Sequence, residues 1–214
     1  MCYQTRLLKS KAQLQERFKG TIDDMEGFNP QKILKAFDFP KTPVITHDAP
    51  DKIQCLQWGL IPSWSNDNSI QNYTLNARIE TITEKPAFKE ATHNRCLVLA
   101  DGFYEWQWLT ANGSKKEKYQ ISLPNDALFA FAGIYSHWVD SEGISTGTYS
   151  IVTTEANALM RKIHNSKKRM PVILSDRNEQ DWLQGAPINS FTSGFQGELI
   201  ATNLDRDPGQ LGLF

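Results

Sequence analysis

The apolar residues of this chain fall into many short runs, and this pattern constrains the fold more than any other feature. The runs alternate apolar with polar residues or stay continuously apolar over lengths typical of strands. Gly, Ser and Pro lie between them and mark frequent turns. We therefore expect a fold rich in strands. The strand-like runs cover residues 43–47, 53–60, 95–106, 118–123, 128–135, 148–154, 171–174 and 198–202.

Helical patterns are fewer and do not alternate strictly with the strands. They cover residues 11–18, 86–91, 155–163 and 176–183. Thr154 and Ser175 precede the last two and can accept free backbone N–H groups as N-caps. This order predicts an α+β fold, a single domain over residues 1–214 built on a largely antiparallel, barrel-like mixed sheet flanked by short helices. The loop 109–117 predicts a hairpin tip.

Composition narrows the function classes. No stretch approaches the roughly 18 apolar residues of a membrane span, so we expect a cytoplasmic protein without a membrane partner. The three cysteines are odd in number, with no C-x-x-C pair and no histidine at zinc-ligand spacing, which indicates neither a disulfide framework nor a metal site. The net charge of −1 gives no overall attraction to nucleic acid, so DNA binding would need a local basic surface.

Cys2 directly follows the initiator methionine, and removal of Met1 is expected because cysteine is small. The residue would then carry a free α-amine, with a reference pKa of about 7.7–8.0, and a thiol, with one of about 8.5. Such an aminothiol condenses with an aldehyde, because the amine forms a Schiff base and the sulfur closes on the imine carbon to give a thiazolidine. The alternative is a small apolar cysteine that helps to bury the first strand.

Two polar groups follow segments that look buried. Residues 76–81 place the amide of Asn76 beside the cation of Arg78, although a solvated turn would read the same way. Residues 101–106 place Glu105 between two aromatic residues at the end of a strand-like run. Desolvation there would raise the pKa of the carboxyl into the range useful for proton transfer. The alternative is a glutamate on an edge strand that faces water.

Residues 161–171 contain five cations and His164 without any acidic residue. Phosphates are the obvious partner of such a segment, although a charge run is also typical of plain solvated surface. Neighbouring cations lower the pKa of a histidine and favour the neutral imidazole needed for proton transfer. Further upstream, Trp58 and Trp64 flank a turn. We expect Trp58 in the core and Trp64 exposed, where it could stack on an unpaired base.

Several uncommon sequence words occur together in this chain. Asn-Ala-Arg-Ile-Glu-Thr stands at residues 76–81 and Gly-Phe-Tyr-Glu-Trp at residues 102–106, behind a cysteine at position two. Together with residues 58–64, 132–135, 151–157 and 164–174, in this order, they make most of the chain resemble the SOS response-associated peptidase family, the SRAP domain.

The resemblance implies a protein of the DNA damage response that senses abasic sites in single-stranded DNA and shields them by a thiazolidine cross-link through Cys2. By position, Asn76 would orient the N-terminal amine, while Glu105 and His164 would move protons as the abasic sugar opens and the adduct closes. No cofactor is implied, and we expect a monomer that associates with the nucleoid on damage. The residues expected to contact DNA are Arg78, Arg169, Trp64, Trp106 and Lys168.

Three features depart from the family pattern. Tyr3 and Gln4 follow the cysteine where the family has Gly-Arg. Three additional residues separate His164 from Arg169-Met-Pro, so that either a loop bulges out and His164 keeps its role, or the site is rebuilt. Residues 28–42 lack the family's Tyr-Asn-x-Ala-Pro segment.

Two other functions compete with the covalent abasic-site sensor. An N-terminal cysteine peptidase would use the same thiol and histidine on an acyl group, and a self-directed form would remove Met1. A non-covalent single-strand-binding module would rely on the basic segment and the tryptophans alone, and its binding would fall with salt.

Overall fold

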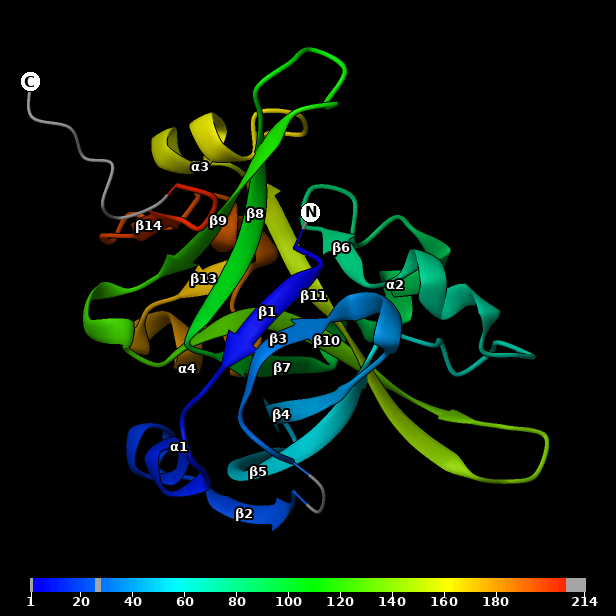
Figure 1. The fold of residues 1–214 in the computed structure, drawn as a ribbon. Coiled ribbons are helices and arrows are strands. Elements are labelled where there is room, and N and C mark those ends of the chain that lie inside the picture. Colours follow the sequence, from blue (N-terminus) through cyan, green and yellow to red (C-terminus); the bar gives the residue numbers. More distant parts are fainter. Residues whose placement is uncertain (1, 26–27, 207–214) are drawn as a thin grey trace, which may run out of the picture.

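The computed structural model describes residues 2–25 and 28–206. They form an α+β fold in which strands dominate and short helices lie at the periphery (Figure 1), as the sequence predicts. The helices are α1 (Lys11–Phe18), α2 (Pro86–Lys89), α3 (Ala158–Ile163) and α4 (Asp176–Leu183). The strands are β1 (Gln4–Leu7), β2 (Thr21–Asp24), β3 (Gln31–Lys35), β4 (Lys41–Thr46), β5 (Ala49–Trp58), β6 (Asn76–Arg78), β7 (Arg95–Ala100), β8 (Gly102–Trp108), β9 (Lys116–Ser122), β10 (Phe129–Val139), β11 (Ser145–Glu155), β12 (Arg169–Pro171), β13 (Ile173–Leu174) and β14 (Ile200–Asn203).

Strands β11, β10, β7, β4 and β5 close into a barrel. Neighbours in this order pair antiparallel, and β5 returns to β11 in parallel, with Gln57 opposite Thr148 and Trp58 opposite Tyr149. A second sheet has the order β14-β9-β8-β1-β3. Strands β2 and β6 add further parallel pairs, with β5 and β11. The predicted mixed, largely antiparallel and barrel-like sheet is thus confirmed. No helix of the described residues is long and apolar enough to cross a membrane.

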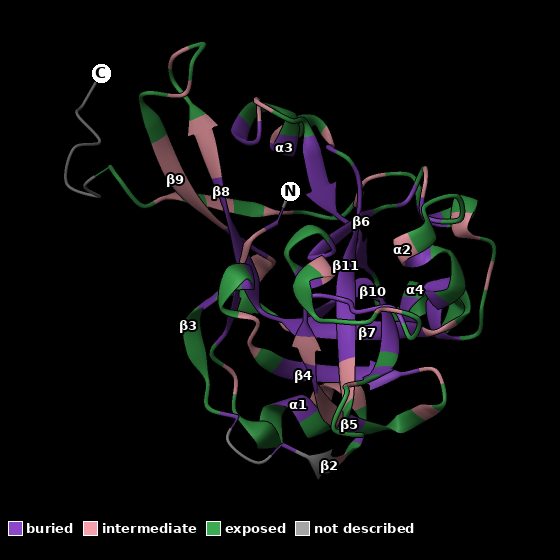
Figure 2. Cartoon of the chain, turned by 90° about the vertical axis from the view of Figure 1, so that its right-hand side faces the viewer, coloured by how far each residue is buried: buried purple, intermediate pink, exposed green. Residues whose placement is uncertain are grey.

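Side-chain alternation along the barrel strands divides the core into two clusters. Every residue of β7 is buried, because both faces of this strand are covered (Figure 2). Leu97 and Leu99 belong to the cluster that α1 and α4 cover. Cys96 and Val98 point the other way, into the cluster shared with β8 and β9. Because alternate side chains of a strand point to opposite faces, β7 contributes residues to both clusters.

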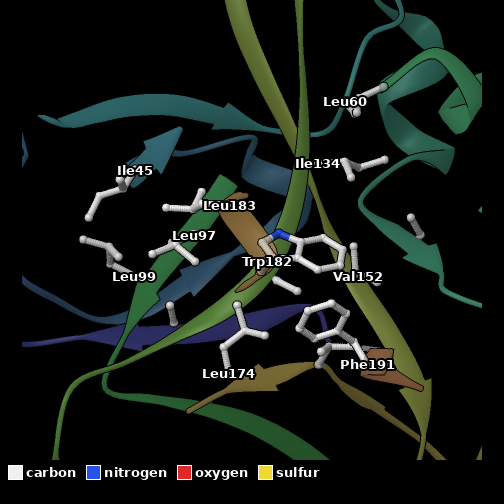
Figure 3. Packing of buried hydrophobic residues seen from close by; sticks show 14 of the residues in the cluster. Ile45, Leu60, Leu97, Leu99, Ile134, Val152, Leu174, Trp182, Leu183 and Phe191 are labelled. Atoms are coloured by element: carbon white, nitrogen blue, oxygen red, sulfur yellow. The ribbon is translucent and has the colours of Figure 1, made fainter. Parts of the chain in front are cut away.

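Trp182 of α4 anchors the first cluster. Its ring lies among apolar side chains of several strands (Figure 3), and the centroid of the Phe191 ring is 5.0 Å away in an edge-to-face orientation. The indole N–H donates to the carbonyl oxygens of Cys96 and Gly133, both at 3.1 Å. The buried polar atom of Trp182 therefore has partners in β7 and β10, and α4 is held against the barrel.

Residues 95–106 are expected to form one strand, but they form two strands in different sheets. The chain passes from β7 to β8 at Asp101, which is fully buried. The Asp101 carboxylate accepts hydrogen bonds from Arg6 Nε at 2.7 Å and from the Leu8 backbone N–H at 2.6 Å. Arg6 also donates to the Asp101 carbonyl oxygen at 2.9 Å. This corner depends on a long-range ion pair, which an apolar pattern cannot reveal.

The third predicted helix starts later than expected. Strand β11 continues to Glu155 because it pairs with β12, so Asn157, and not Thr154, caps α3. Ser175 caps α4 as predicted. The loop 109–117 is the expected hairpin tip, since β8 and β9 pair as far as Trp108 opposite Lys116. The short strands β1, β2, β3 and β6 are missing from the sequence prediction.

Candidate active site

Cys2 lies just before β1, a strand held between β3 and β8 (Figure 1). Its side chain is fully buried, as the core alternative predicted. The Asn76 side-chain amide donates a hydrogen bond to the Cys2 carbonyl oxygen at 2.9 Å. Burial raises the pKa of the Cys2 thiol well above its ordinary value, and Glu105 raises it further once it ionises. The thiol is therefore un-ionised at neutral pH.

Asn76 is positioned by the parallel pairing of β6 with β11, which places it opposite Ile151. Its side chain is buried and has a donor and an acceptor. The amide nitrogen binds the Cys2 carbonyl, while Oδ1 has no hydrogen-bond partner among the described residues. This buried oxygen lies next to Cys2 and is suited to accept a hydrogen bond from an N–H group of Cys2.

Glu105 of β8 and His164 at the C-terminal end of α3 come together in the fold. Glu105 Oε1 is 3.6 Å from His164 Nδ1, and both side chains are buried. Burial raises the pKa of Glu105 to about 8 and lowers the pKa of His164 to about 4. His164 Nδ1 lies 2.7 Å from the Arg169 carbonyl oxygen. Because a carbonyl only accepts, Nδ1 carries the proton and Nε2 carries the lone pair.

A cavity of about 300 Å³ lies beside these two residues. Four of the residues that line it are ones that the sequence indicates, namely Arg78, Glu105, Trp106 and His164. Residues at this cavity that the sequence did not assign to the site are Tyr3, Trp108, Lys116, Ser166 and Lys167. Trp108 follows Trp106 at a spacing of two on β8, and a pair of aromatic residues at that spacing is the one local signal that could have indicated it.

Arg169 lies elsewhere and is buried. Its guanidinium binds both carboxylate oxygens of Glu80, at 2.6 and 2.9 Å, and donates to the Thr153 carbonyl oxygen at 2.7 Å. Although burial opposes it, the hydrogen bond from Arg169 keeps the pKa of Glu80 below its ordinary value. In this arrangement Arg169 joins β12 to the segment after β6 and does not line the cavity.

Trp64 and Lys168 also lie outside the cavity lining. Trp64 is 50% exposed in the loop after β5, whereas Trp58 is fully buried, so the expected division between the two tryptophans is confirmed. Lys168 is exposed and has a left-handed backbone conformation, with φ of 52°. Contacts of Trp64, Lys168 and Arg169 with DNA stay predictions.

The additional residues after His164 form a loop that leaves this histidine beside Glu105. The loop is closed by a hydrogen bond from the Lys168 backbone N–H to the His164 carbonyl oxygen at 2.8 Å. Asn165 fastens it to β8, since its Oδ1 accepts from the Trp108 backbone N–H at 3.0 Å and its Nδ2 donates to the Trp108 carbonyl oxygen at 2.8 Å. The additional residues thus bulge out as a loop, and the role of His164 stays a prediction.

Tyr3 and Gln4, which stand where the family has Gly-Arg, both make side-chain contacts in the fold. The Tyr3 ring lies 5.2 Å from the Phe37 ring, and Gln4 Oε1 accepts a hydrogen bond from Lys118 Nζ at 2.9 Å. Within residues 2–25 and 28–206, no group of three or more His, Cys, Asp or Glu side chains is placed to hold a metal ion.

Comparison with known proteins places this geometry in a family. The family model described as "SOS response associated peptidase (SRAP)" matches residues 1–201. The chain belongs to the SRAP family. Among its relatives, abasic site processing protein YoaM of Bacillus subtilis is 41% identical over 163 residues, which are 76% of this chain and 69% of that protein. Abasic site processing protein HMCES of Xenopus tropicalis is 34% identical over 155 residues, which are 61% of this chain and 44% of that protein.

Solved structures agree with the SRAP assignment. A protein from Bacteroides thetaiotaomicron superimposes with a TM-score of 0.87 and 34% sequence identity, covering 94% of this chain and 91% of the other. A protein from Bordetella bronchiseptica has the same fold, with a TM-score of 0.80 at 23% identity, covering 96% of this chain and all of the other. The barrel with its additional strands is thus an SRAP fold.

Proposed function

We propose that this SRAP protein processes abasic sites in single-stranded DNA by forming a thiazolidine through Cys2 after Met1 has been removed. The observation that supports it best is that Asn76 donates a hydrogen bond to the Cys2 carbonyl oxygen, while Glu105, which is near enough to act on the Cys2 thiol, lines one cavity together with His164. The relatives YoaM and HMCES carry the name abasic site processing protein. One copy of the chain would bind one lesion and shield it from strand cleavage.

The reaction forms one C–N and one C–S bond, breaks two C–O bonds at the anomeric carbon, and otherwise needs only proton transfers. Opening of the sugar hemiacetal moves a proton from the anomeric hydroxyl to the ring oxygen and exposes an aldehyde. The Cys2 amine adds to the aldehyde carbon, and loss of water gives the imine. The sulfur then adds to the imine carbon while the thiol proton passes to nitrogen. No bond of the DNA backbone breaks, and no oxidant is required.

The two buried neutral groups fit these transfers. Glu105, with a pKa raised to about 8, still holds its proton at neutral pH and can donate it to the leaving water or ring oxygen. His164, with a pKa lowered to about 4, is neutral and can accept a proton at Nε2. Asn76 Oδ1 would accept a hydrogen bond from the Cys2 amine and hold its lone pair toward the aldehyde.

A denaturing gel with an abasic single-stranded oligonucleotide tests the proposal. We expect wild type, with Met1 shown to be absent by intact mass, to give an adduct that survives denaturant without any reducing agent. Cys2→Ala keeps the amine, so its Schiff base should appear only after borohydride trapping. An N-terminal extension keeps the thiol but blocks the amine and should give neither. A stable adduct from the extended protein, or none from wild type, would rule out the thiazolidine.

The family description supports a second candidate activity, that of a peptidase acting on its own N-terminus. The Cys2 sulfur would attack the Met1 carbonyl carbon, the amide C–N bond would break to free the amine, and water would hydrolyse the thioester. Cell-free synthesis without a methionine aminopeptidase tests this. Wild type should lose Met1 and Cys2→Ala should keep it. Retention of Met1 by both proteins would contradict self-processing but would leave the cross-linking proposal standing.

A further inference from the structure

We propose that Lys116 and Lys167 form a phosphate-binding subsite at the cavity beside Glu105 and His164, and that it binds a DNA backbone phosphate next to the lesion. This inference deepens the proposed function and rests on it. Lys116 lies outside the segments that carry the family resemblance, and Lys167 lies in the loop by which this chain departs from the family pattern.

The cavity is cationic and its cations are available. Arg78 of β6, Lys116 of β9 and Lys167 of the loop after α3 line it from three elements. None of these three side chains makes an ion pair or a hydrogen bond with any residue that the structure describes. Among the residues described, the one acidic residue in the lining is Glu105, which is buried. Glu80, on which the charge of Arg78 acts, lies outside the lining and is paired with Arg169. An anion would therefore meet positive charge without a competing carboxylate at the surface.

Lys167 reaches the cavity because its loop is fastened at two points. Asn165 binds both the N–H and the carbonyl of Trp108, at 3.0 and 2.8 Å. The Gln107 side chain donates to the Lys162 carbonyl oxygen at 3.2 Å. These bonds join the loop and the end of α3 to the outer part of β8. Ser166 also lines the cavity and adds a hydroxyl donor to the two ammonium groups.

Lys116 is held on the opposite strand of the hairpin. It pairs across from Trp108, and its ammonium lies 5.9 Å from the centroid of the Trp106 ring. Lys118 Nζ lies 5.2 Å from the same ring, so the aromatic face carries two cations. A phosphate between Lys116 and Lys167 would relieve the repulsion among these charges. The tryptophan rings beside it would face the sugar or a neighbouring base.

Binding can be measured separately from covalent chemistry. We would use a single-stranded oligonucleotide with a tetrahydrofuran site, which has no aldehyde, and follow fluorescence anisotropy over a range of salt. A second oligonucleotide carries a neutral methylphosphonate in place of one phosphate flanking the site, tested on each side in turn. Wild type should bind one of these two about two- to fivefold more weakly than the natural strand.

The double variant Lys116→Ala/Lys167→Ala should bind the natural strand and that methylphosphonate strand equally. The slope of log affinity against log salt should fall by about 0.7 in this double variant, because one phosphate contact is lost. Lys115→Ala removes a charge from the same hairpin outside the cavity lining and should keep the wild-type preference. Wild type indifferent to both methylphosphonates, or a double variant with the full wild-type preference, would overturn the subsite.

Asn165→Ala tests whether the position of Lys167, and not only its charge, matters for binding. It keeps both lysines but removes the two hydrogen bonds to Trp108, and it should lose the methylphosphonate preference as the double variant does. Asn72→Ala, which removes an exposed amide that binds only the Ser69 carbonyl, should keep it. Because tetrahydrofuran cannot cross-link, a positive result here with no adduct on true abasic DNA would reject the proposed function and keep the subsite. An adduct on true abasic DNA with no methylphosphonate preference would reject the subsite and keep the proposed function.

Discussion

Glu105 Oε1 lies 3.6 Å from His164 Nδ1, yet the two side chains do not form an ion pair at neutral pH. Burial raises the pKa of the acid to about 8 and lowers the pKa of the imidazole to about 4, so both groups are neutral. The Nδ1 proton points to the Arg169 carbonyl oxygen, 2.7 Å away. The pair therefore offers one proton to give, on Glu105, and one lone pair, on His164 Nε2.

The cross-linking rate should show a maximum near pH 8 that depends on Glu105. The rate rises as the α-amine loses its proton, around its reference pKa of about 7.7–8.0, and falls as Glu105 ionises at about 8. Glu105→Gln should be slower by about 10²–10⁴-fold and should lose the alkaline fall, because glutamine has no proton to give. Initial rates on gels across this range test it. An alkaline fall that persists in the variant would contradict the acid role.

The free energy of unfolding should fall between about pH 5 and pH 8 because of the Glu105 carboxyl. Its pKa rises from an ordinary 4.5 to about 8 on folding, so its contribution is complete below 4.5 and is lost as pH rises through 8. The loss is on the order of a few kcal/mol. The lowered pKa of His164 has the opposite effect, since it reduces stability as pH falls. This effect is the same in wild type and in the variant Glu105→Gln. Urea unfolding near pH 5 and pH 9 should show a smaller decrease for Glu105→Gln than for wild type.

Asn76→Ala should slow cross-linking and also lower the free energy of unfolding, for two separate reasons. The change leaves the Cys2 carbonyl without its donor, at a cost of about 1–3 kcal/mol in unfolding free energy. It also removes the acceptor for the amine, and misplacement of the reacting group can cost about 10²-fold in rate. Asn72→Ala serves as the control. A rate loss that disappears when folding is restored by lower temperature would mean that Asn76 only stabilises the fold.

The two carboxylates that bind Arg6 should contribute very different amounts to the free energy of unfolding. Asp101 is buried and lies 2.7 Å from Arg6 Nε, whereas Asp126 is 54% exposed and lies 2.6 Å from Arg6 Nη2. Asp101→Asn leaves part of a buried charge uncompensated and should cost about 3–5 kcal/mol. Asp126→Asn should cost about 1 kcal/mol or less, because water screens that pair. Urea unfolding of both variants measures the difference, and equal losses would refute it.

The strands that form the barrel could be predicted because their apolar patterns are local. The closure of the barrel could not, since nothing near Trp58 or Tyr149 in the sequence indicates that they lie opposite each other. The corner at Asp101 was missed for the same reason, because its partner Arg6 is far away in the chain. Strands as short as β1 and β6 have too few residues to show a period.

For the candidate site, the sequence indicated Arg78, Glu105, Trp106 and His164, and long-range geometry added the other residues that line the cavity. Lys116 reaches the cavity because β9 folds back over β8, and no local pattern distinguishes it from the neighbouring Lys115. Arg169 reads as a free cation in a basic run, yet it binds Glu80. Pairings of this kind depend on where the strands meet in space, which single-sequence patterns do not encode.

Cys2 is 162 residues away in the sequence from His164, and Asn76 and Glu105 lie between them. At about 5–20 residues per second, some 8–30 seconds of synthesis separate Cys2 from His164. During this interval the chain cannot yet bury Cys2 as the folded protein does. If the proposed function is right, removal of Met1 within the interval would leave an exposed aminothiol that any aldehyde could consume, so later removal would preserve the protein for DNA.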